Sequence, residues 1–336
     1  MTIKDLAKET GYSVGTISRV LNGQPNVSER ARQTILDYVE KSGFQLNSNA
    51  KQLRQTHGDG ILAVVTGRQN ELFAQMIEHI QRLLSETQYP LTVDYVDETE
   101  DAVQYALRYS REKKPRGILF LGGDTQLFAQ SFGAIHVPSV LLTSDASELG
   151  FRNLSSVTTD DIAAAQCAVE YLFAQGHRRI GIINGDLIYS GLSWLRYEGC
   201  RRAFAAHGMT LSEEQCETAR YSFADGYAAA KRLVRSQKLT AIFAMSDVMA
   251  IGAMRALRDS GLRVPEDISV IGFDGLVLGE YYIPKLTTVR QDAEQLARRG
   301  VELLLHALKE KTPARHEKVS FELAVQDSVS PLSDPS

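Results

Sequence analysis

Apolar positions over residues 1–44 recur with the spacing of helices, and turn residues divide the segment into three parts. Thr2 stands where an N-cap is expected, and Gly11 ends the first predicted helix. Ser13 precedes a second helix, and Ser28 precedes a third. Two short helices joined by a turn, with a third helix as a brace, are typical of a helix-turn-helix unit.

A different pattern begins at residue 60, where short apolar runs alternate with longer helical patterns. The runs of strand length are 61–65, 91–96, 117–121, 139–142, 180–183, 241–244 and 269–272. The helical patterns surround Phe73 and cover 101–113, 162–175, 194–207, 226–237, 247–260 and 292–309. Strands that alternate with helices predict parallel sheets with right-handed crossovers. There are more units than one small sheet needs, so we expect an α/β domain of two lobes, each with a doubly wound parallel sheet.

Two further segments lack such patterns. The polar residues 45–57 indicate a linker that can become helical when other parts of the assembly support it. The composition of residues 329–336 indicates a disordered tail.

Charge is divided unevenly along the 336 residues, although the net charge is only −4. Residues 1–56 hold 8 basic and 5 acidic side chains, and the remainder holds 29 basic and 36 acidic ones. The excess of basic residues in 1–56, beside an acidic remainder, gives modest support to nucleic-acid binding by residues 1–56.

Composition excludes several other classes of protein. No apolar run is long enough to span a membrane, and the N-terminus lacks the apolar core of a signal peptide, so we expect a cytoplasmic protein. The three cysteines are far apart and form no CxxC pair, which argues against a zinc site or a disulfide framework. We expect neither a metal nor a cofactor.

Residues 4–22, KDLAKETGYSVGTISRVLN, closely resemble the helix-turn-helix signature of the LacI/GalR family of bacterial repressors. Further blocks follow in the order and spacing of that family, at 47–53, 176–181, 245–257, 261–274 and 286–292. The resemblance covers essentially the whole chain. It implies a homodimer, two periplasmic-binding-protein-like lobes, and binding to pseudo-palindromic operator DNA under the control of a small-molecule effector.

The resemblance also suggests domain boundaries. We expect a helix-turn-helix DNA-binding domain at 1–44, a hinge helix or linker at 45–59, and an effector-binding and dimerisation domain at 60–336. The chain should cross between the lobes three times. Lobe 1 would hold about 60–160 and 292–318, and lobe 2 about 161–291 and 319–336.

The second helix, about 13–22, is the expected recognition helix. Its outward positions are Val14, Gly15, Thr16 and Arg19. By resemblance Val14 and Gly15 occupy the principal base-discriminating pair, yet Val14 offers only apolar contact and Gly15 has no side chain. Direct readout should therefore depend on Arg19, whose guanidinium can pair with guanine O6 and N7. The alternative for Arg19 is an ordinary solvated arginine.

Four residues of the same segment match positions that hold phosphates in the family, namely Thr2, Ser13, Ser18 and Asn22. Hydroxyl and amide groups at helix ends suit that task. The alternative is helix capping, and for Thr2 and Ser13 both can be true.

The linker 47–53 resembles the family's hinge helix, which folds when two subunits meet over the operator. Asn47 begins it, Ala50 must be small for two hinges to approach, and Leu53 would insert between base pairs in the minor groove. Leu46 stands where the family usually has proline, which leaves the path into the hinge uncertain. A plain flexible linker is the alternative.

Polar residues follow the predicted strands of the larger domain, where ligands of doubly wound sheets bind. Thr66 follows 61–65, Ser246 follows 241–244, and Asp274 follows 269–272. Asp247 we interpret as structural, as the N-cap of the next helix.

By resemblance Arg196 and Asp274 match the family's ligand hydroxyl-binding pair, Tyr221 an aromatic that stacks on the ligand, and Phe73 the opposite wall. A guanidinium and a carboxylate each bind two neighbouring hydroxyls, so the expected effector is a sugar or a polyol. The alternative is that Arg196 and Asp274 form an internal ion pair. Ser246 departs from the family's frequent asparagine, and the loop 186–193 is slightly long, so no particular sugar follows.

Two other functions fit the sequence less well. An α/β enzyme would need a phosphate-binding loop, a Gly-x-Ser-x-Gly elbow or paired metal-ligating histidines, and none is present. A transport-linked sugar-binding protein would need an export signal and would not need residues 1–56. The sequence does not show whether the effector releases the DNA or strengthens its binding.

Overall fold

The computed structural model describes residues 3–21, 27–42, 60–67, 70–98, 100–187 and 191–332. The chain divides into two compact units, Met1–Thr56 and His57–Ser336, and each is described by itself. No helix in these described ranges is both long enough and apolar enough to cross a membrane.

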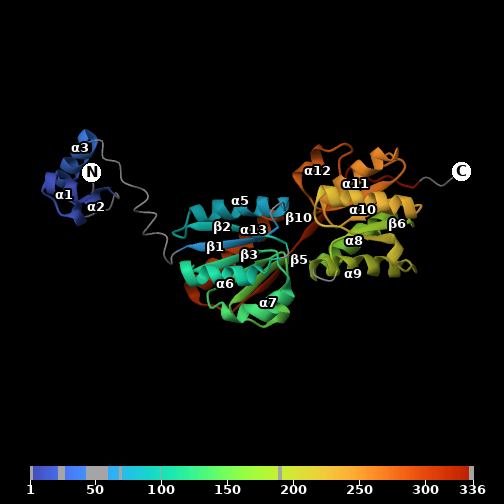
Figure 1. Cartoon of the computed structure of the whole chain (residues 1–336), viewed down its shortest axis with the longest axis horizontal. Helices are drawn as coiled ribbons and strands as arrows, with labels where there is room; N and C mark the ends of the chain where they lie inside the picture. Colours follow the sequence, from blue (N-terminus) through green and yellow to red (C-terminus); the bar gives the residue numbers. More distant parts are fainter. Residues whose placement is uncertain are drawn as a thin grey trace. The chain divides into compact units, whose positions relative to one another are not determined.

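The described part of the first unit contains three short helices, α1 (Ile3–Thr10), α2 (Val14–Leu21) and α3 (Glu29–Ser42) (Figure 1). Gly11 ends α1 with a φ of 72°, and its N–H donates to the carbonyl of Ala7 at 3.1 Å. The three helices bury one small apolar core, made of Leu6, Ile17, Val20 and Ile35.

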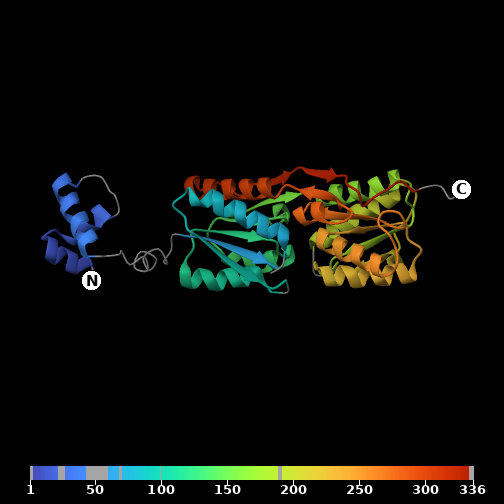
Figure 2. The same ribbon diagram turned by 90° about the horizontal axis from the view of Figure 1, so that it is seen from above.

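Lobe 1 of the second unit is built on a six-stranded sheet in the order β11-β5-β4-β3-β1-β2. Its strands are β1 (Ile61–Thr66), β2 (Leu91–Val96), β3 (Gly117–Leu121), β4 (Ser139–Leu142), β5 (Leu154–Thr159) and β11 (His316–Val319). All neighbouring strands in this sheet are parallel. The helices α5 (Glu71–Ser85) and α13 (Ala293–Glu310) lie side by side on one face (Figure 2). The other face is covered by α6 (Ala102–Lys113) and α7 (Thr125–Ser131).

Lobe 2 is built on a second six-stranded sheet in the order β12-β10-β9-β8-β6-β7. Its strands are β6 (Ile180–Asn184), β7 (Cys216–Thr218), β8 (Ala241–Ala244), β9 (Ser269–Asp274), β10 (Thr287–Gln291) and β12 (Phe321–Ala324). Its helices are α8 (Asp161–Ala174), α9 (Gly191–Ala206), α10 (Phe223–Ser236), α11 (Asp247–Asp259) and the short α12 (Val277–Tyr281). In Figure 1, α10 and α11 lie on one side of the sheet and α8 and α9 on the other.

The prediction of two doubly wound sheets is confirmed, with one correction. β12 pairs with β10 in the antiparallel direction, so the second sheet is not wholly parallel. Only one residue separates β12 from β11, and the chain passes straight from one sheet into the other without a crossover helix that could reverse it.

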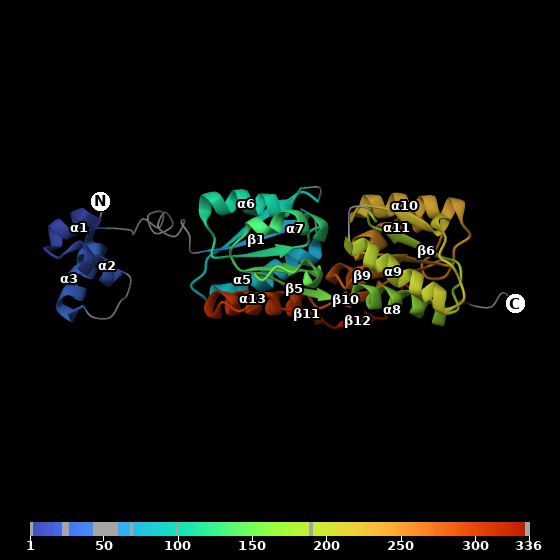
Figure 3. The same cartoon turned by 90° about the horizontal axis from the view of Figure 1, so that it is seen from below.

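The chain passes between the lobes three times, after β5, after β10 and after β11 (Figure 3). The lobes also touch beside these connections. Val248 of α11 and Leu276 belong to the same apolar cluster as Leu72 and Phe73 of α5. The carboxyl ends of both sets of strands therefore face a shared junction.

Candidate functional site

The helix α2 has one buried face and one exposed face. Ile17 and Val20 are buried in the core of the first unit, whereas Gly15 and Arg19 are exposed and Thr16 is half-buried. Arg19 is therefore free to reach a partner outside the unit. This amphipathic arrangement is the one that a DNA-reading helix needs.

Ser13 caps the helix α2. Its Oγ accepts a hydrogen bond from the backbone N–H of Thr16 at 3.1 Å and lies 2.9 Å from Thr16 Oγ1. The capping function considered for Ser13 is thus present, and it leaves the second oxygen lone pair able to accept or the hydroxyl able to donate to a phosphate.

Several predicted DNA contacts lie outside the described residues: Thr2, Asn22, Asn47, Ala50 and Leu53, together with the side chains of Val14 and Ser18. They stay predictions.

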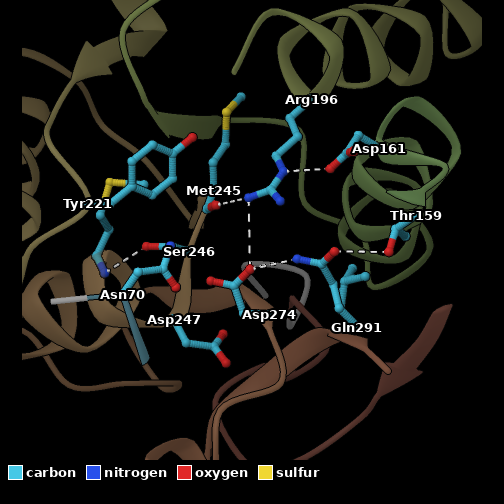
Figure 4. Close-up of polar contacts among 12 residues, drawn as sticks. Asn70, Thr159, Asp161, Arg196, Tyr221, Met245, Ser246, Asp247, Asp274 and Gln291 are labelled. Atoms are coloured by element: carbon cyan, nitrogen blue, oxygen red, sulfur yellow. Dashed lines mark hydrogen bonds and ion pairs between the residues drawn. The ribbon is translucent and has the colours of Figure 1, made fainter. Parts of the chain in front are cut away.

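Arg196 lies at the centre of a buried network in lobe 2 (Figure 4). Its Nε donates to Asp161 Oδ1 at 2.9 Å, and its Nη1 donates to the carbonyl of Met245 at 2.6 Å. Asp274 Oδ1 is farther from Nη1, at 3.9 Å. The guanidinium also stacks on Phe273, 3.7 Å from the ring centroid. The helix α9 begins at Gly191, earlier than the predicted start at 194, so Arg196 lies in its second turn.

Asp161 is the strongest partner of Arg196, and sequence reasoning missed it. The internal ion pair that was the alternative interpretation of Arg196 therefore exists, but with Asp161. Burial disfavours the charge of Arg196, whereas Asp161, Tyr221 and Asp274 outweigh that effect and raise its pKa. Arg196 therefore stays positively charged at neutral pH, and its charge lies close to the carboxylate of Asp274.

Asp274 ends β9 in an unusual backbone conformation, with a φ of 119°. Its Oδ1 accepts a hydrogen bond from Gln291 Nε2 at 2.9 Å, and Gln291 in turn accepts one from Thr159 Oγ1 at 2.9 Å. Burial raises the pKa of Asp274 to about 6, although Arg196 opposes the shift. Thr159 ends β5 and Gln291 ends β10, and the chain passes between the lobes after each of these strands. The hydrogen bonds therefore link the carboxylate of Asp274 to the junction of the lobes.

The expected role of Asp247 as an N-cap is wrong. Ser246 caps α11, because its Oγ accepts from the N–H of Met249 at 3.3 Å. Asp247 instead accepts from Thr288 Oγ1 and from the N–H of Leu276, both at 2.6 Å. Burial, and then the nearby Asp274, raise the pKa of Asp247 well above its usual value. Ser and Asp are equally good caps, and the sequence does not show that the second of them points across to β10.

A small pocket of about 10 Å³ lies between the lobes. Asn70 and Glu71 line it from lobe 1, and Tyr221, Ser246, Val248, Asp274 and Leu276 line it from lobe 2. Three predicted effector residues, Tyr221, Ser246 and Asp274, thus come together in one place. Asn70 and Glu71 were missed, although Asn70 is recognisable in the sequence as an N-cap of the helix after the first strand.

Three predicted effector residues do not line this pocket, namely Arg196, Phe73 and Thr66. Phe73 is only 6% exposed and packs in the core of lobe 1, where it fills the space beside Gly122. Thr66 ends β1, and its Oγ1 is buried with no hydrogen-bond partner in the described part of the chain. An orphaned hydroxyl of this kind is rare in a folded protein and marks the strand end as a place where a polar partner would be stabilising.

Comparisons with known proteins agree with this architecture. The family model of bacterial regulatory proteins of the lacI family matches residues 2–47, and that of a periplasmic binding protein-like domain matches residues 169–329. The transcriptional regulator MalR of Clostridium butyricum is 34% identical over 98% of this chain and 99% of its own. The probable transcriptional repressor ExuR of Bacillus subtilis is 33% identical over 99% of both chains.

Solved structures give the same result. The Lac repressor dimer bound to operator and an anti-inducer has a TM-score of 0.83 and 25% identity, over 98% of this chain and 99% of its own. The regulator CelR in complex with cellobiose has a TM-score of 0.71 and 26% identity over the same shares. With full-length relatives above 30% identity and a matching DNA-binding head, this chain belongs to the LacI family of bacterial transcription regulators.

Proposed function

We propose that this regulator represses transcription by binding an operator as a homodimer, and that a sugar or sugar derivative bound between its lobes controls that binding. The proposed class of effector rests on the side chains that line the pocket between the lobes. A carboxylate (Asp274), a hydroxyl (Ser246), an amide (Asn70) and an aromatic ring (Tyr221) border one pocket. Hydroxyl-rich rings are bound by such sets, with acceptors at the edge and an aromatic face beside them.

The names of relatives support the same class. CelR was solved with cellobiose, and the ribose operon repressor of Haemophilus influenzae is 29% identical over 92% of this chain. One group of relatives, named PurR, carries no sugar in its name, so the experiment includes nucleobases.

Lobe 2 has an exposed apolar surface that a second copy of the chain can bind. Val277, Tyr281 and Ile283 are large apolar residues in and after α12, and the last two are 80% and 84% exposed. Such a cluster of exposed apolar side chains is unusual on a monomer and supports the homodimer.

The test is a thermal-shift screen of the full chain against monosaccharides, disaccharides, uronic acids, sugar phosphates and nucleobases. A ligand that binds only the folded state raises the melting temperature, so a sugar hit is expected. Operator fragments, selected from a random pool with the same protein, are then titrated with and without the hit at fixed salt. The coupling should change operator affinity by roughly 5–150-fold.

Two controls separate the possible outcomes. Asp274→Asn should lose the shift, and an exposed change remote from the junction, Lys309→Gln, should keep it. A shift by nucleobases alone, or a sugar hit that leaves operator affinity unchanged, would refute the proposal.

A further inference from the structure

Lobe 2 contains a second and larger cavity, of about 510 Å³, beside the edge strand β7. Its lining includes Asn184, Trp194, Tyr197, Arg201, Glu213 and Thr218. None of these residues lines the pocket between the lobes. The volume lies within the range of about 300–1,000 Å³ that is usual for small-molecule sites.

An aromatic wall forms one side of this cavity. Trp194, the single tryptophan of the chain, is 48% exposed, and its ring centroid lies 5.9 Å from that of Tyr197. An exposed indole on the first turns of a helix adds nothing to the core of the lobe. It does offer a flat apolar face on which the C–H face of a sugar ring can stack.

Polar groups complete the lining. Asn184 is only 1% exposed, and its Oδ1 has no hydrogen-bond partner among the residues that the structure describes. A buried amide oxygen without a partner is costly, and a ligand hydroxyl would satisfy it. Glu213 and Thr218 are exposed on the same cavity, and Arg201 forms an exposed ion pair with Glu198 at 2.8 Å.

The two cavities flank one pair of side chains. Ser193 Oγ and Tyr221 Oη are 2.8 Å apart, and Tyr221 lines the pocket between the lobes while Ser193 directly precedes Trp194. Gly185 follows Asn184 and passes close to the same pair, since a Cβ on it would lie 2.2 Å from Ser193 Oγ. This pair of hydroxyls and Gly185 therefore lie beside residues of both sites.

We propose that the cavity at Trp194 is a second sugar-ring subsite, so that the effector is an oligosaccharide of at least two rings. One ring lies between the lobes beside Tyr221 and Asp274, and the next stacks on Trp194 with its hydroxyls toward Asn184. This inference rests on the proposed sugar effector and specifies its size.

The single tryptophan makes the test specific to this cavity. The full chain is titrated with matched ligands that share one ring, glucose against maltose and cellobiose, and galactose against lactose. Trp194 fluorescence should change with the bound disaccharide and not with the monosaccharide. By thermal shift and calorimetry, Trp194→Ala should weaken the disaccharide about tenfold and leave the monosaccharide unchanged. Trp194→Phe should restore most of the difference.

Tyr95→Ala removes an equally exposed aromatic from lobe 1 and serves as the matched control, which should bind both ligands normally. The second subsite is refuted if monosaccharides bind and disaccharides do not, or if Trp194→Ala affects both ligands equally or neither. Failure of every sugar to bind would refute the sugar effector itself, and with it the subsite.

Discussion

Asp274 combines burial, a left-handed backbone conformation and a carboxyl group whose pKa is raised to about 6. Each property is destabilising by itself, because charge is poorly solvated in the interior and a non-glycine residue at positive φ is strained. Hydrogen bonding from Gln291 and the nearby Arg196 only partly offset these costs. A residue held in this way is better explained by ligand binding than by folding.

The raised pKa of Asp274 gives a prediction about stability. Because the folded-state pKa lies above the unfolded value of 3.8, its favourable contribution is present at low pH and is lost as pH rises from about 4 to 6. Asp274→Asn cannot ionise, so it should be more stable than the wild type at pH 7.5, by up to about 3 kcal/mol. Denaturant unfolding at pH 7.5 and pH 4 measures this. A variant that is less stable at pH 7.5, or equally stabilised at both pH values, would contradict the prediction.

Arg19 carries the prediction for DNA reading. It is exposed on α2, between core residues that fix the orientation of the helix. Arg19→Ala should lose about 1–3 kcal/mol of binding to the selected operator and keep weak, salt-sensitive binding to random DNA.

The alternative role of Arg19 is a contact with a DNA phosphate. Equal losses on operator and random DNA, in titrations at two salt concentrations, would assign Arg19 to the backbone. Arg30→Ala, also exposed but on α3, is the matched control for a general loss of positive charge.

The sequence predicted part of the site and not the rest, for a physical reason. Ser246 and Asp274 could be found because ligand residues follow strands, and Tyr221 through the family resemblance. Asp161, Thr159 and Gln291 act through contacts between segments distant in sequence, and such pairings leave no local pattern. Phe73 carries the right residue type at the expected place, yet its ring turns into the core of lobe 1.

At the scale of elements, α10 and α11 approach each other closely because glycines face across their contact. A Cβ on Gly252 would lie 2.2 Å from the carbonyl oxygen of Phe223, and one on Gly226 would lie 2.4 Å from that of Met249. The backbones of α10 and α11 thus occupy the space that a side chain at either glycine would need. This close contact holds α11, and therefore Ser246 at its N-terminus, in position.

Gly252→Ala should therefore destabilise the protein by about 1–3 kcal/mol, although alanine is the better helix former. A lower melting temperature in the absence of ligand measures the effect. Gly133→Ala is the control, because its new Cβ would be 3.8 Å from Phe151, an ordinary contact. An unchanged melting temperature for Gly252→Ala would show that the two helices can separate without cost.

Most strands and helices of the larger unit were predictable because buried parallel strands are continuous apolar runs. The missed strands are of two other kinds. β7, β11 and β12 have three or four residues each and lie at sheet edges, where half-exposed side chains mix polar and apolar types. β5 and β10 are buried inside their sheets, but serine and threonine interrupt their apolar pattern. Their pairing depends on neighbours that the local pattern does not specify.

At the scale of the whole larger unit, the two lobes are closed on each other. Val248 and Leu276 of lobe 2 belong to the apolar cluster that contains Leu72 and Phe73 of lobe 1. On another side of the junction, a Cβ on Gly191 of α9 would lie 3.5 Å from Thr125 Oγ1 of α7. The γ atom of residue 125 thus lies close to where a Cβ at 191 would stand, so two cysteine side chains at these positions could meet.

The pair Thr125→Cys and Gly191→Cys should thus form a cross-link that holds the lobes closed. Oxidised protein should bind operator with one fixed affinity that no longer responds to effector, and a reductant should restore the response. Each single variant is the control for the changed residues and the native thiols. Cross-linked protein that still responds to effector would mean that the switch does not need the lobes to open.

The three connections between the lobes constrain how such a regulator can be recombined. The DNA-binding head has its own core and one attachment, so a single exchange of gene segments can supply a new head and a new operator. A lobe cannot be exchanged in this way, because each is assembled from separate stretches of the chain. The last short segment, β11 followed by β12, even supplies an edge strand to both sheets. New effector preferences should therefore arise residue by residue within an intact pair of lobes, while new operators can be acquired whole.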